Sequence, residues 1–436
     1  MDLGLALLDV GVGERPEDFA LFSQAVDPAW IDAALTATGT ATVRRRRLPA
    51  EQVVWLVIGM GMFRDRSIAE VVEHLDLVLP ATNGREVSSS ALVQARDRLG
   101  AAPLGRLFEQ LADHWAAASA EERRWRGLAL YGVDGSTLRI ADTPENEAEF
   151  GRPGGSRGAA GYPQLRVAAL LVLRSHLLAG LAIGPWTTGE TTLAESLWGK
   201  IPDRSLTVLD RGFLSYGMLH RLHQAGTDRH WLIRAKSNLK WRVVERLGRN
   251  DQLVEITMPR ALRAADPKLP ETFVVRAVRY KRPKYRTQTL LTSLLDPALY
   301  PAAEIALLYH ERWELELAFD EIKTHTLERE ESLRSRAPER VRQELWGLAI
   351  AYNLVRWHID RIAERLDLPP NRISYRHTLM LLRGFWLSVW FASPGVVPRR
   401  LEQLDAQSAL FVLPPRRPRR YPRAVKVKMS GYARKR

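Results

Sequence analysis

The order of strands and helices after Gly127 is the feature that most limits the folds open to this chain. Apolar, β-branched runs alternate there with amphipathic segments. We expect strands at residues 128–134, 166–173, 177–184, 205–210 and 230–236, and helices at 190–200 and 212–226. Three strands followed by a helix, a strand, a helix and a strand predict an α/β fold in which helices pack against a mixed sheet.

The segments on either side of this core have different patterns. Residues 1 to about 120 show helical periodicity and predict several short helices. Residues 237–300 are rich in β-branched side chains and predict a β-rich insertion. Helices resume near Ala302, and the chain ends in a Pro- and Arg-rich tail without periodicity.

Two of the expected strands end on an aspartate, Asp134 in GVDGST and Asp210 in VLDRGF. Asp is common where a strand meets a turn, so one such residue would carry little information. Two of them, followed by a helix that contains Glu316, predict a cluster of three carboxylates. Such a cluster repels itself unless a cation neutralises it, and oxygen ligands suit Mg²⁺ or Mn²⁺. Two such ions about 3.5–4 Å apart are a common arrangement for attack on a phosphodiester.

The helix expected from Ala302 carries four polar side chains next to its apolar stripe. They are Tyr309, Arg312, Glu316 and Lys323. At about 100° per residue they fall within roughly 60° of one another. One interpretation is a solvent-exposed ladder of ion pairs, because Arg312 and Glu316 are four residues apart. The other is a functional surface at the margin of the buried face.

The ordered set of motifs resembles the ribonuclease H-like DDE transposases of bacterial insertion sequences. The helix matches the signature of the insertion sequence 4 family, which is Tyr, two residues, Arg, three residues, Glu, six residues and Lys. The stretches around Asp134 and Asp210 also resemble those of the family, and a β insertion before the Glu is a family feature. The resemblance covers residues 127–366 well and the flanking parts more loosely.

The resemblance implies a role for each of these residues. Glu316 would complete a catalytic site with Asp134 and Asp210. This site would hold two divalent ions, Mg²⁺ or Mn²⁺. The residues expected to hold DNA phosphates beside that site are Tyr309, Arg312 and Lys323. Asp142 and Glu190 are weaker candidates for contact with the metal or DNA, because Asp142 is better explained as a turn residue and Glu190 could be a helix cap.

The resemblance also implies a function. A transposase would bind the terminal inverted repeats of an insertion sequence, hydrolyse the strand at each end, and use the freed 3′-hydroxyl to attack target DNA. We expect double-stranded DNA as the partner, a homodimer in the synaptic complex, and a bacterial cytoplasmic, nucleoid-associated location. The alternatives are a ribonuclease H-like nuclease or resolvase without strand transfer, and an inactive DNA-binding descendant.

The same resemblance suggests how the chain is divided. Residues 121–236 and 301–400 would form the two parts of the ribonuclease H-like core, and the second part would contain the Glu316 helix and the C-terminal helices. The remaining parts would be a helical N-terminal DNA-binding domain at 1–120, the β insertion at 237–300 and a basic tail at 401–436.

The distribution of charge supports a nucleic-acid partner. The formal net charge is +14, and basic residues are concentrated in two tracts, which we expect to contact DNA. Their arginines include Arg44, Arg45, Arg46, Arg47, Arg416, Arg417, Arg419 and Arg420. The chain has no cysteine, which excludes disulfides and thiolate zinc sites. Its longest apolar run, residues 53–63, is too short to cross a membrane.

Removal of the basic tail tests its expected contact with DNA. Residues 416–436 contain ten cations and no acid. If half of them engage phosphates, deletion from Pro414 onward flattens the slope of log K against log[salt] by roughly 4–5. Binding to insertion-sequence ends and to random duplex should weaken by similar factors, measured at several salt concentrations. An unchanged slope would show that the tail does not touch DNA, and selective loss of end binding would show that it reads sequence.

Overall fold

The computed structural model describes residues 26–41, 49–74, 88–155, 158–159, 161–282, 286–328, 332–389 and 397–415. The two arginine tracts expected to contact DNA, Arg44–Arg47 and Arg416–Arg420, lie outside these residues. None of the described helices combines the length and the apolar character needed to cross a bilayer.

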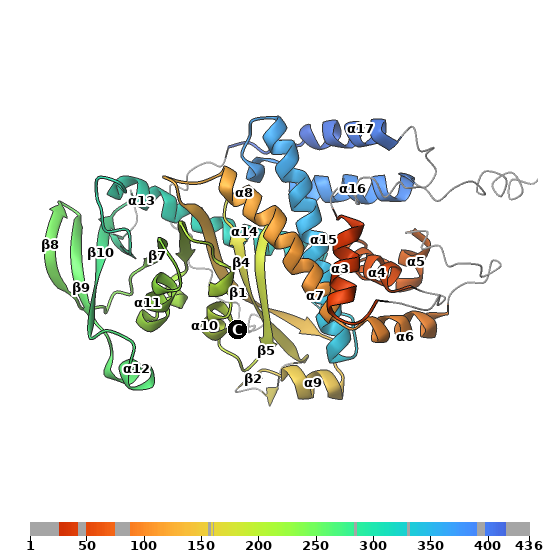
Figure 1. Cartoon of the computed structure of the whole chain (residues 1–436), viewed down its shortest axis with the longest axis horizontal. Coiled ribbons are helices and arrows are strands. Elements are labelled where there is room, and N and C mark those ends of the chain that lie inside the picture. The colour runs from red at the N-terminus through yellow and green to blue at the C-terminus, as the bar shows by residue number, and fades with distance from the viewer. Residues whose placement is uncertain are drawn as a thin grey trace, which may run out of the picture.

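Ten strands within the described residues form one mixed sheet (Figure 1). One half of it contains, in spatial order, β5 (Leu178–Pro185), β4 (Gln164–Val172), β1 (Ala129–Ile140), β6 (Ser205–Leu209) and β7 (Arg229–Arg234). Strand β4 runs antiparallel to β5 and β1, whereas β1, β6 and β7 run parallel to one another. The expected strands and the mixed sheet are therefore confirmed, and the arrangement is the predicted ribonuclease H-like fold.

The β insertion extends this sheet at the edge formed by β7 (Figure 1). Its strands, in spatial order, are β11 (Gln288–Thr292), β10 (Thr272–Tyr280), β9 (Asp251–Thr257) and β8 (Arg242–Gly248). Strand β8 was not expected, because it is an exposed edge strand with several charged side chains. Fully buried Arg276 pairs with Asp251 and donates to the carbonyl of Tyr300 at 2.7 Å, which fixes the insertion to the chain that follows it.

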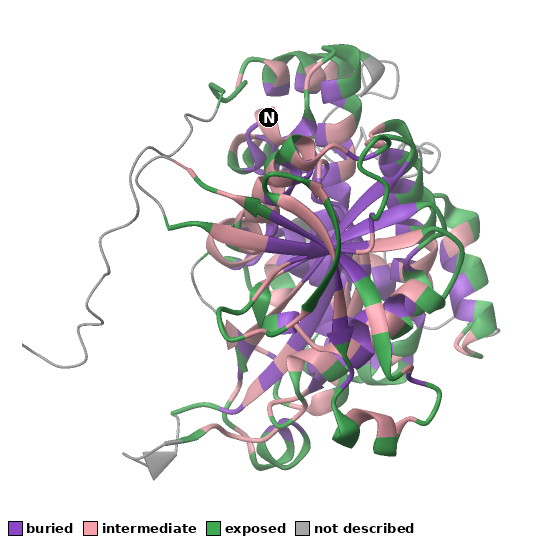
Figure 2. Ribbon diagram, turned by 90° about the vertical axis from the view of Figure 1, so that its left-hand side faces the viewer, coloured by how far each residue is buried: buried purple, intermediate pink, exposed green. Residues whose placement is uncertain are grey.

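Helices cover both faces of the ribonuclease H-like half. The covering helices are α10 (Glu190–Glu195), α14 (Trp313–Asp320) and α15 (Pro338–Arg365). A Cβ added to Gly132 would lie 2.6 Å from Leu315 of α14, and a Cβ added to Gly135 would lie 2.8 Å from Cγ of Glu190 of α10. Residues three apart in a strand face opposite sides, so α10 and α14 lie on opposite faces. Figure 2 shows that buried residues gather in the sheet and the helices packed on it.

The other helices extend the core beyond the sheet. The N-terminal ones are α3 (Pro28–Ala37), α4 (Ala50–Met62), α5 (Ile68–His74), α6 (Ser89–Leu99), α7 (Ala102–Leu111) and α8 (Ala117–Glu122). The remaining ones are α9 (Pro144–Phe150), α11 (Tyr216–Gln224), α12 (Arg260–Ala265), α13 (Ala302–Leu308), α16 (Tyr375–Val389) and α17 (Val397–Ala409). Helices α3, α4 and α7 share one hydrophobic core with α15 and the sheet. Helix α17 was not expected, and it crosses residue 401, where the basic tail was expected to begin.

Two glycines let α4 and α15 cross with their backbones in contact. A Cβ on Gly347 would lie 2.5 Å from the carbonyl oxygen of Val57, and a Cβ on Gly61 would lie 2.8 Å from that of Gly347. Backbone atoms cannot rotate away as side chains do, so a larger residue at either position must separate the helices. The N-terminal helices are therefore docked on the core through a contact that only glycine permits.

Replacement of Gly347 tests this contact. Gly347→Ala should lower the free energy of unfolding by about 1–3 kcal/mol, measured by chemical denaturation, because the crossing must open. The matched control is Gly384→Ala in α16, where an added Cβ meets nothing within 4 Å. That change should be neutral or stabilising by up to about 1 kcal/mol, since alanine favours helix. Equal effects of the two substitutions would contradict the close crossing.

Candidate active site

The register of two parallel strands brings Asp134 and Asp210 to the same place in the sheet. The last pair between β1 and β6 is Val133 with Leu209, and each aspartate is the next residue along the chain. Asp134 was expected at the end of its strand, and this was wrong. Strand β1 continues to Ile140 because Asp134 and the residues after it remain paired with β4.

Beyond this pair, one side of β1 has no neighbouring strand for several residues. Pairing with β6 ends at Val133, and pairing with β12 (Ser332–Leu333) begins only at Arg139. Among the described residues, positions 134–138 therefore form an open edge of the sheet on this side. We call this stretch the open edge, and Asp134 is its first residue.

The segment that carries Glu316 is not the single regular helix that was expected. It consists of α13, a 3-10 turn at Tyr309–Arg312, α14, and a π-helical turn at Glu321–Thr326. The angle per residue differs in each part. The constant angle of about 100° per residue used to place Tyr309, Arg312, Glu316 and Lys323 on one side of a single helix therefore does not apply across the whole segment. Arg312 and Glu316 remain neighbours, with a distance of 2.9 Å between Nη2 and Oε1.

Arg312 contacts two of the three predicted carboxylates. Besides its bond to Glu316, its Nη1 lies 3.6 Å from Oδ1 of Asp210, and its charge acts on Asp134. Burial opposes the charged guanidinium, but hydrogen bonding to Glu316 and the charge of Asp210 raise the pKa of Arg312 above its usual value. The side chain is thus a permanent cation between Glu316 of α14 and Asp210, which follows β6.

Asp134 is in an environment that disfavours its negative charge. Burial raises the pKa of Asp134 to about 6, and the nearby charges of Asp210 and Glu190 act in the same direction. The Gly135 N–H, which donates to Asp134 at 2.8 Å, and the charge of Arg312 oppose this rise. Because the effects that raise the pKa outweigh those that lower it, an additional cation nearby would stabilise the charged form of Asp134.

The residues fit a divalent cation by chemistry, although they do not form a ready-made site. Within the described part of the chain, no three acidic or histidine side chains lie close enough together to hold a metal ion. The donor set consists only of carboxylate oxygens, which are the ligands that Mg²⁺ and Mn²⁺ prefer. In this structure the guanidinium of Arg312 supplies the positive charge that two of the carboxylates require.

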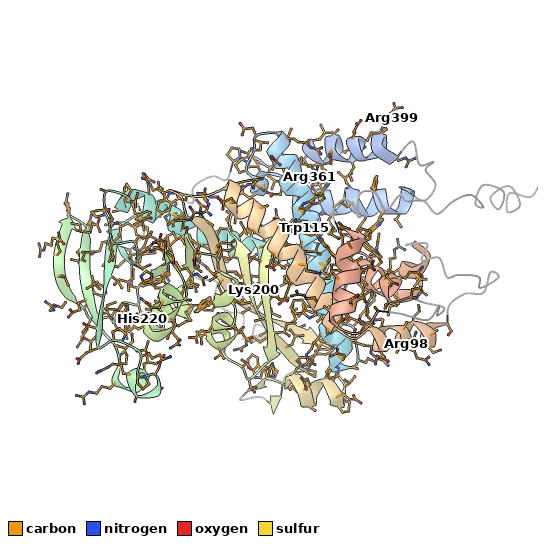
Figure 3. The ribbon with its side chains drawn as sticks, viewed as in Figure 1. Arg98, Trp115, Lys200, His220, Arg361 and Arg399 are labelled. Carbon is orange, nitrogen blue, oxygen red and sulfur yellow. The ribbon has the colours of Figure 1, made fainter. Side chains whose placement is uncertain are left out.

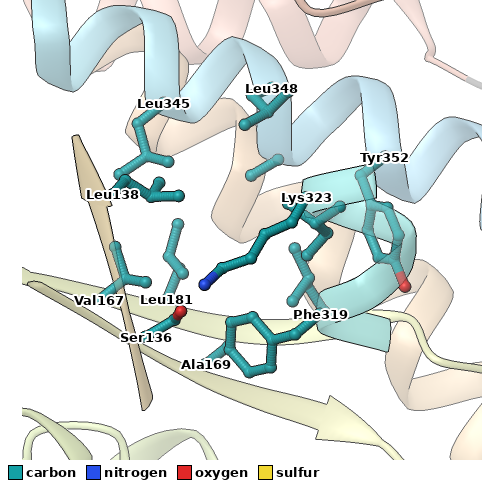
Figure 4. Close-up of a pocket in the computed structure, with 13 residues that line it drawn as sticks. Ser136, Leu138, Val167, Ala169, Leu181, Phe319, Lys323, Leu345, Leu348 and Tyr352 are labelled. Carbon is teal, nitrogen blue, oxygen red and sulfur yellow. The ribbon is translucent and has the colours of Figure 1, made fainter. Parts of the chain in front are cut away.

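Tyr309 and Lys323 have different surroundings. Tyr309 is buried, and burial raises its pKa to about 12, so its hydroxyl stays neutral. The charges of Arg234, at the end of β7, and of Arg312 act on it. Arg234 was not singled out from the sequence, where an Arg at a strand end gives no distinctive signal. Lys323 points into a pocket between the sheet and α15 that is lined mainly by apolar side chains, with Ser136 near its tip (Figure 4).

A buried ion-pair network fixes the segment that carries Glu316. Glu321 pairs with Arg356 of α15 and accepts a hydrogen bond from Tyr352 at 3.0 Å. His176, between β4 and β5, accepts from Arg356 at 2.7 Å through Nδ1, which leaves Nε2 to donate to Glu314 at 2.9 Å. Glu314 and Glu321 therefore point away from Glu316 and are not available as metal ligands.

The sequence analysis did not predict this network. A sign of it was present, because Arg356 lies within a largely apolar stretch of α15 and a buried arginine requires an acidic partner. Asp142, a weaker candidate from the sequence, pairs with Arg152. Asp142 is thus an ion-paired residue after the end of β1 rather than part of the carboxylate cluster.

The family models and the known proteins that this chain resembles are all transposases. Residues 16–109 match the model of the insertion element 4 transposase N-terminal region, and residues 127–354 match that of the transposase DDE domain. The chain is 38% identical over 409 residues to the "Transposase InsG for insertion sequence element IS4" of Escherichia coli K12, covering 93% of this chain and 92% of that protein. It is 35% identical over 271 residues to the "Putative transposase InsZ" of the same strain, covering 62% and 88%. A solved piggyBac transposase synaptic complex with hairpin DNA matches 93% of this chain and 87% of that one, with 11% identity and a TM-score of 0.42.

Removal of the Glu321 charge tests the buried network. Burial alone would raise the pKa of Glu321, but pairing with the charge of Arg356 outweighs this effect and lowers the pKa from 4.5 to about 2. The stability it contributes is present above about pH 4.5 and is lost as the pH falls toward 2. Glu321→Gln should therefore lower the free energy of unfolding by about 3 kcal/mol at pH 7.

The difference between wild type and Glu321→Gln should shrink as the pH falls below 4.5. The control is Glu311→Gln, which removes a half-exposed partner of Arg174 and should cost about 1 kcal/mol or less. Unfolding at a series of pH values measures both. A difference that does not change with pH would contradict a charged, buried Glu321.

Proposed function

The chain belongs to the insertion element 4 family of DDE transposases, and on this basis we propose that Asp134, Asp210 and Glu316 are the catalytic carboxylates of its reaction. Its function is DNA transposition, which requires an enzyme that binds DNA, cuts it and transfers strands. The observation that supports this assignment best is the position of Arg312, whose guanidinium bridges Asp210 and Glu316 and whose charge acts on Asp134.

We propose that the three carboxylates hold two divalent ions, either Mg²⁺ or Mn²⁺. A divalent cation bound there would supply the positive charge that a phosphodiester requires when an oxygen attacks it. The protein contributes the positions of the oxygen ligands. Asp134 and Asp210 are fixed by the register of β1 and β6, and Glu316 is fixed by the packing of Leu315 over Gly132.

Arg312 and its neighbours would position the scissile DNA. A guanidinium can form paired hydrogen bonds to a phosphate as well as to a carboxylate, but it cannot serve both partners at once. Cation binding at the carboxylates would therefore release Arg312 toward a phosphate at the transposon end. Neutral Tyr309 would donate a hydrogen bond there and would not act as a nucleophile. Lys323 would lie farther along the same face of the sheet.

We propose that double-stranded DNA, comprising the terminal repeats and the target, also contacts basic residues outside the carboxylate site. Arg98 of α6, Arg361 of α15 and Arg399 of α17 are exposed, and Figure 3 shows them on the helical part of the molecule. The tracts Arg44–Arg47 and Arg416–Arg420 would add to this contact. A homodimer in the synaptic complex would hold the two ends together for the strand transfer.

Substitution of each carboxylate tests the proposed site. With DNA that carries the terminal repeats and Mg²⁺ or Mn²⁺, the wild-type chain should nick the ends and join them to target DNA. Asp134→Asn, Asp210→Asn and Glu316→Gln should each reduce cleavage by about 100-fold or more, because each removes a charge at the reacting phosphate. Binding of the ends, measured by gel shift in Ca²⁺, should change little.

Asp142→Asn is the matched control, since it removes a carboxylate that lies near β1 but pairs with Arg152. Its cleavage should stay within a few-fold of wild type. Full cleavage by any of the three active-site variants would refute the assigned set. Cleavage without any joined product would indicate a nuclease that does not transfer strands.

A further inference from the structure

A fourth carboxylate approaches the same edge of the sheet from the opposite face. Asp134 shares its face of β1 with Gly132, over which Leu315 of the Glu316 helix packs. Gly135 faces the other way, and there the side chain of Glu190, the first residue of α10, lies against it. The two faces meet at the open edge, where no strand separates them on one side of β1.

Glu190 lies directly on the strand backbone next to Asp134. A Cβ added to Gly135 would be 2.8 Å from Cγ, 2.9 Å from Cδ and 3.2 Å from Oε2 of Glu190. The absence of a side chain at Gly135 is what allows this approach. The carboxylate of Glu190 therefore stands over the residue whose N–H already donates to Asp134.

The charge of Glu190 has no partner that would explain its position. Neither a hydrogen bond nor an ion pair joins its carboxylate to another group in the described part of the chain, and the residue is partly buried. By contrast, Glu195 of the same helix pairs with Arg221 at 2.6 Å. An acid in the first turn of a helix is favourable, but α10 has only six residues and its dipole is correspondingly small. Placing the carboxylate of Glu190 over the residue next to Asp134 brings two like charges close together, which is unfavourable unless a cation lies near them.

We propose that Glu190 is a fourth carboxylate of the divalent-cation site, contributed by α10 from the face of the sheet opposite Glu316. This inference rests on the proposed function, which places the cation at Asp134, Asp210 and Glu316. The site is then built from both faces of the sheet, with the two aspartates at the edge between them. Gly135 is required because any side chain there would push Glu190 away.

Direct measurement of Mn²⁺ binding tests this proposal without relying on activity. Mn²⁺ is titrated into the full chain, and free Mn²⁺ is measured by electron paramagnetic resonance. Glu190→Gln should weaken the tightest Mn²⁺ binding by about tenfold or more, because a metal-site carboxylate is replaced by a neutral amide of the same shape. The control is Glu195→Gln, which removes a carboxylate from the same helix and should leave Mn²⁺ binding unchanged.

A second variant displaces Glu190 without removing it. Gly135→Ala keeps every carboxylate, but its methyl group occupies the position of the Glu190 side chain. It should weaken Mn²⁺ binding in the wild-type background and add little in the Glu190→Gln background. Equal effects in both backgrounds would mean that Gly135→Ala acts through Asp134, which would overturn the part assigned to Glu190.

The same titration separates this inference from the proposed function. If Asp134→Asn weakens Mn²⁺ binding while Glu190→Gln binds like wild type, Glu190 is not part of the site, and the three-carboxylate assignment stands. If Asp134→Asn, Asp210→Asn and Glu316→Gln all bind Mn²⁺ like wild type, both proposals are wrong. Weaker binding by Glu190→Gln, with Glu195→Gln unchanged, supports the fourth carboxylate.

Discussion

The buried ion pair between Glu321 and Arg356 is the interaction on which the catalytic core depends. It joins the π-helical end of the Glu316 segment to α15, and His176 extends it to the turn between β4 and β5. Charges in a low-dielectric interior are costly unless they are paired, so loss of one partner leaves the other without compensation. Helix α15 also packs against α4 of the N-terminal helices. The Glu316 segment, the sheet and the N-terminal helices are therefore all in contact with α15.

The open edge of the sheet is where the carboxylates of the proposed site come together. Parallel pairing of β1 with β6 stops at Val133 and Leu209, and the two aspartates follow at the same level. Strand β1 continues alone on that side, which leaves an edge that side chains can reach from either face. Glu316 approaches from one face and Glu190 from the other. A strand paired with β1 beyond this point would have covered the edge that both side chains approach.

Charge balance explains how carboxylates can gather at one sheet edge in a folded chain. Carboxylates gathered at a sheet edge repel one another, and the raised pKa of Asp134 is a direct consequence of burial and of that repulsion. Arg312 offsets part of the repulsion through Asp210 and Glu316. A cation at the carboxylates and a phosphate at Arg312 would therefore favour each other, which couples metal binding to DNA binding.

The sequence by itself determined the strand order, the ribonuclease H-like class, the β insertion and the family, because apolar periodicity and the spacing of Tyr309, Arg312, Glu316 and Lys323 are local properties. It did not determine the breaks in the Glu316 helix or the length of β1, because both depend on partners far along the chain. A helical wheel assumes one constant angle per residue, whereas the turns before and after α14 adjust to the sheet and to Arg356. The place of Glu190 beside Asp134 was likewise decided only by tertiary structure, since a glycine on one strand and the first turn of a later helix reveal their contact only after the sheet has formed.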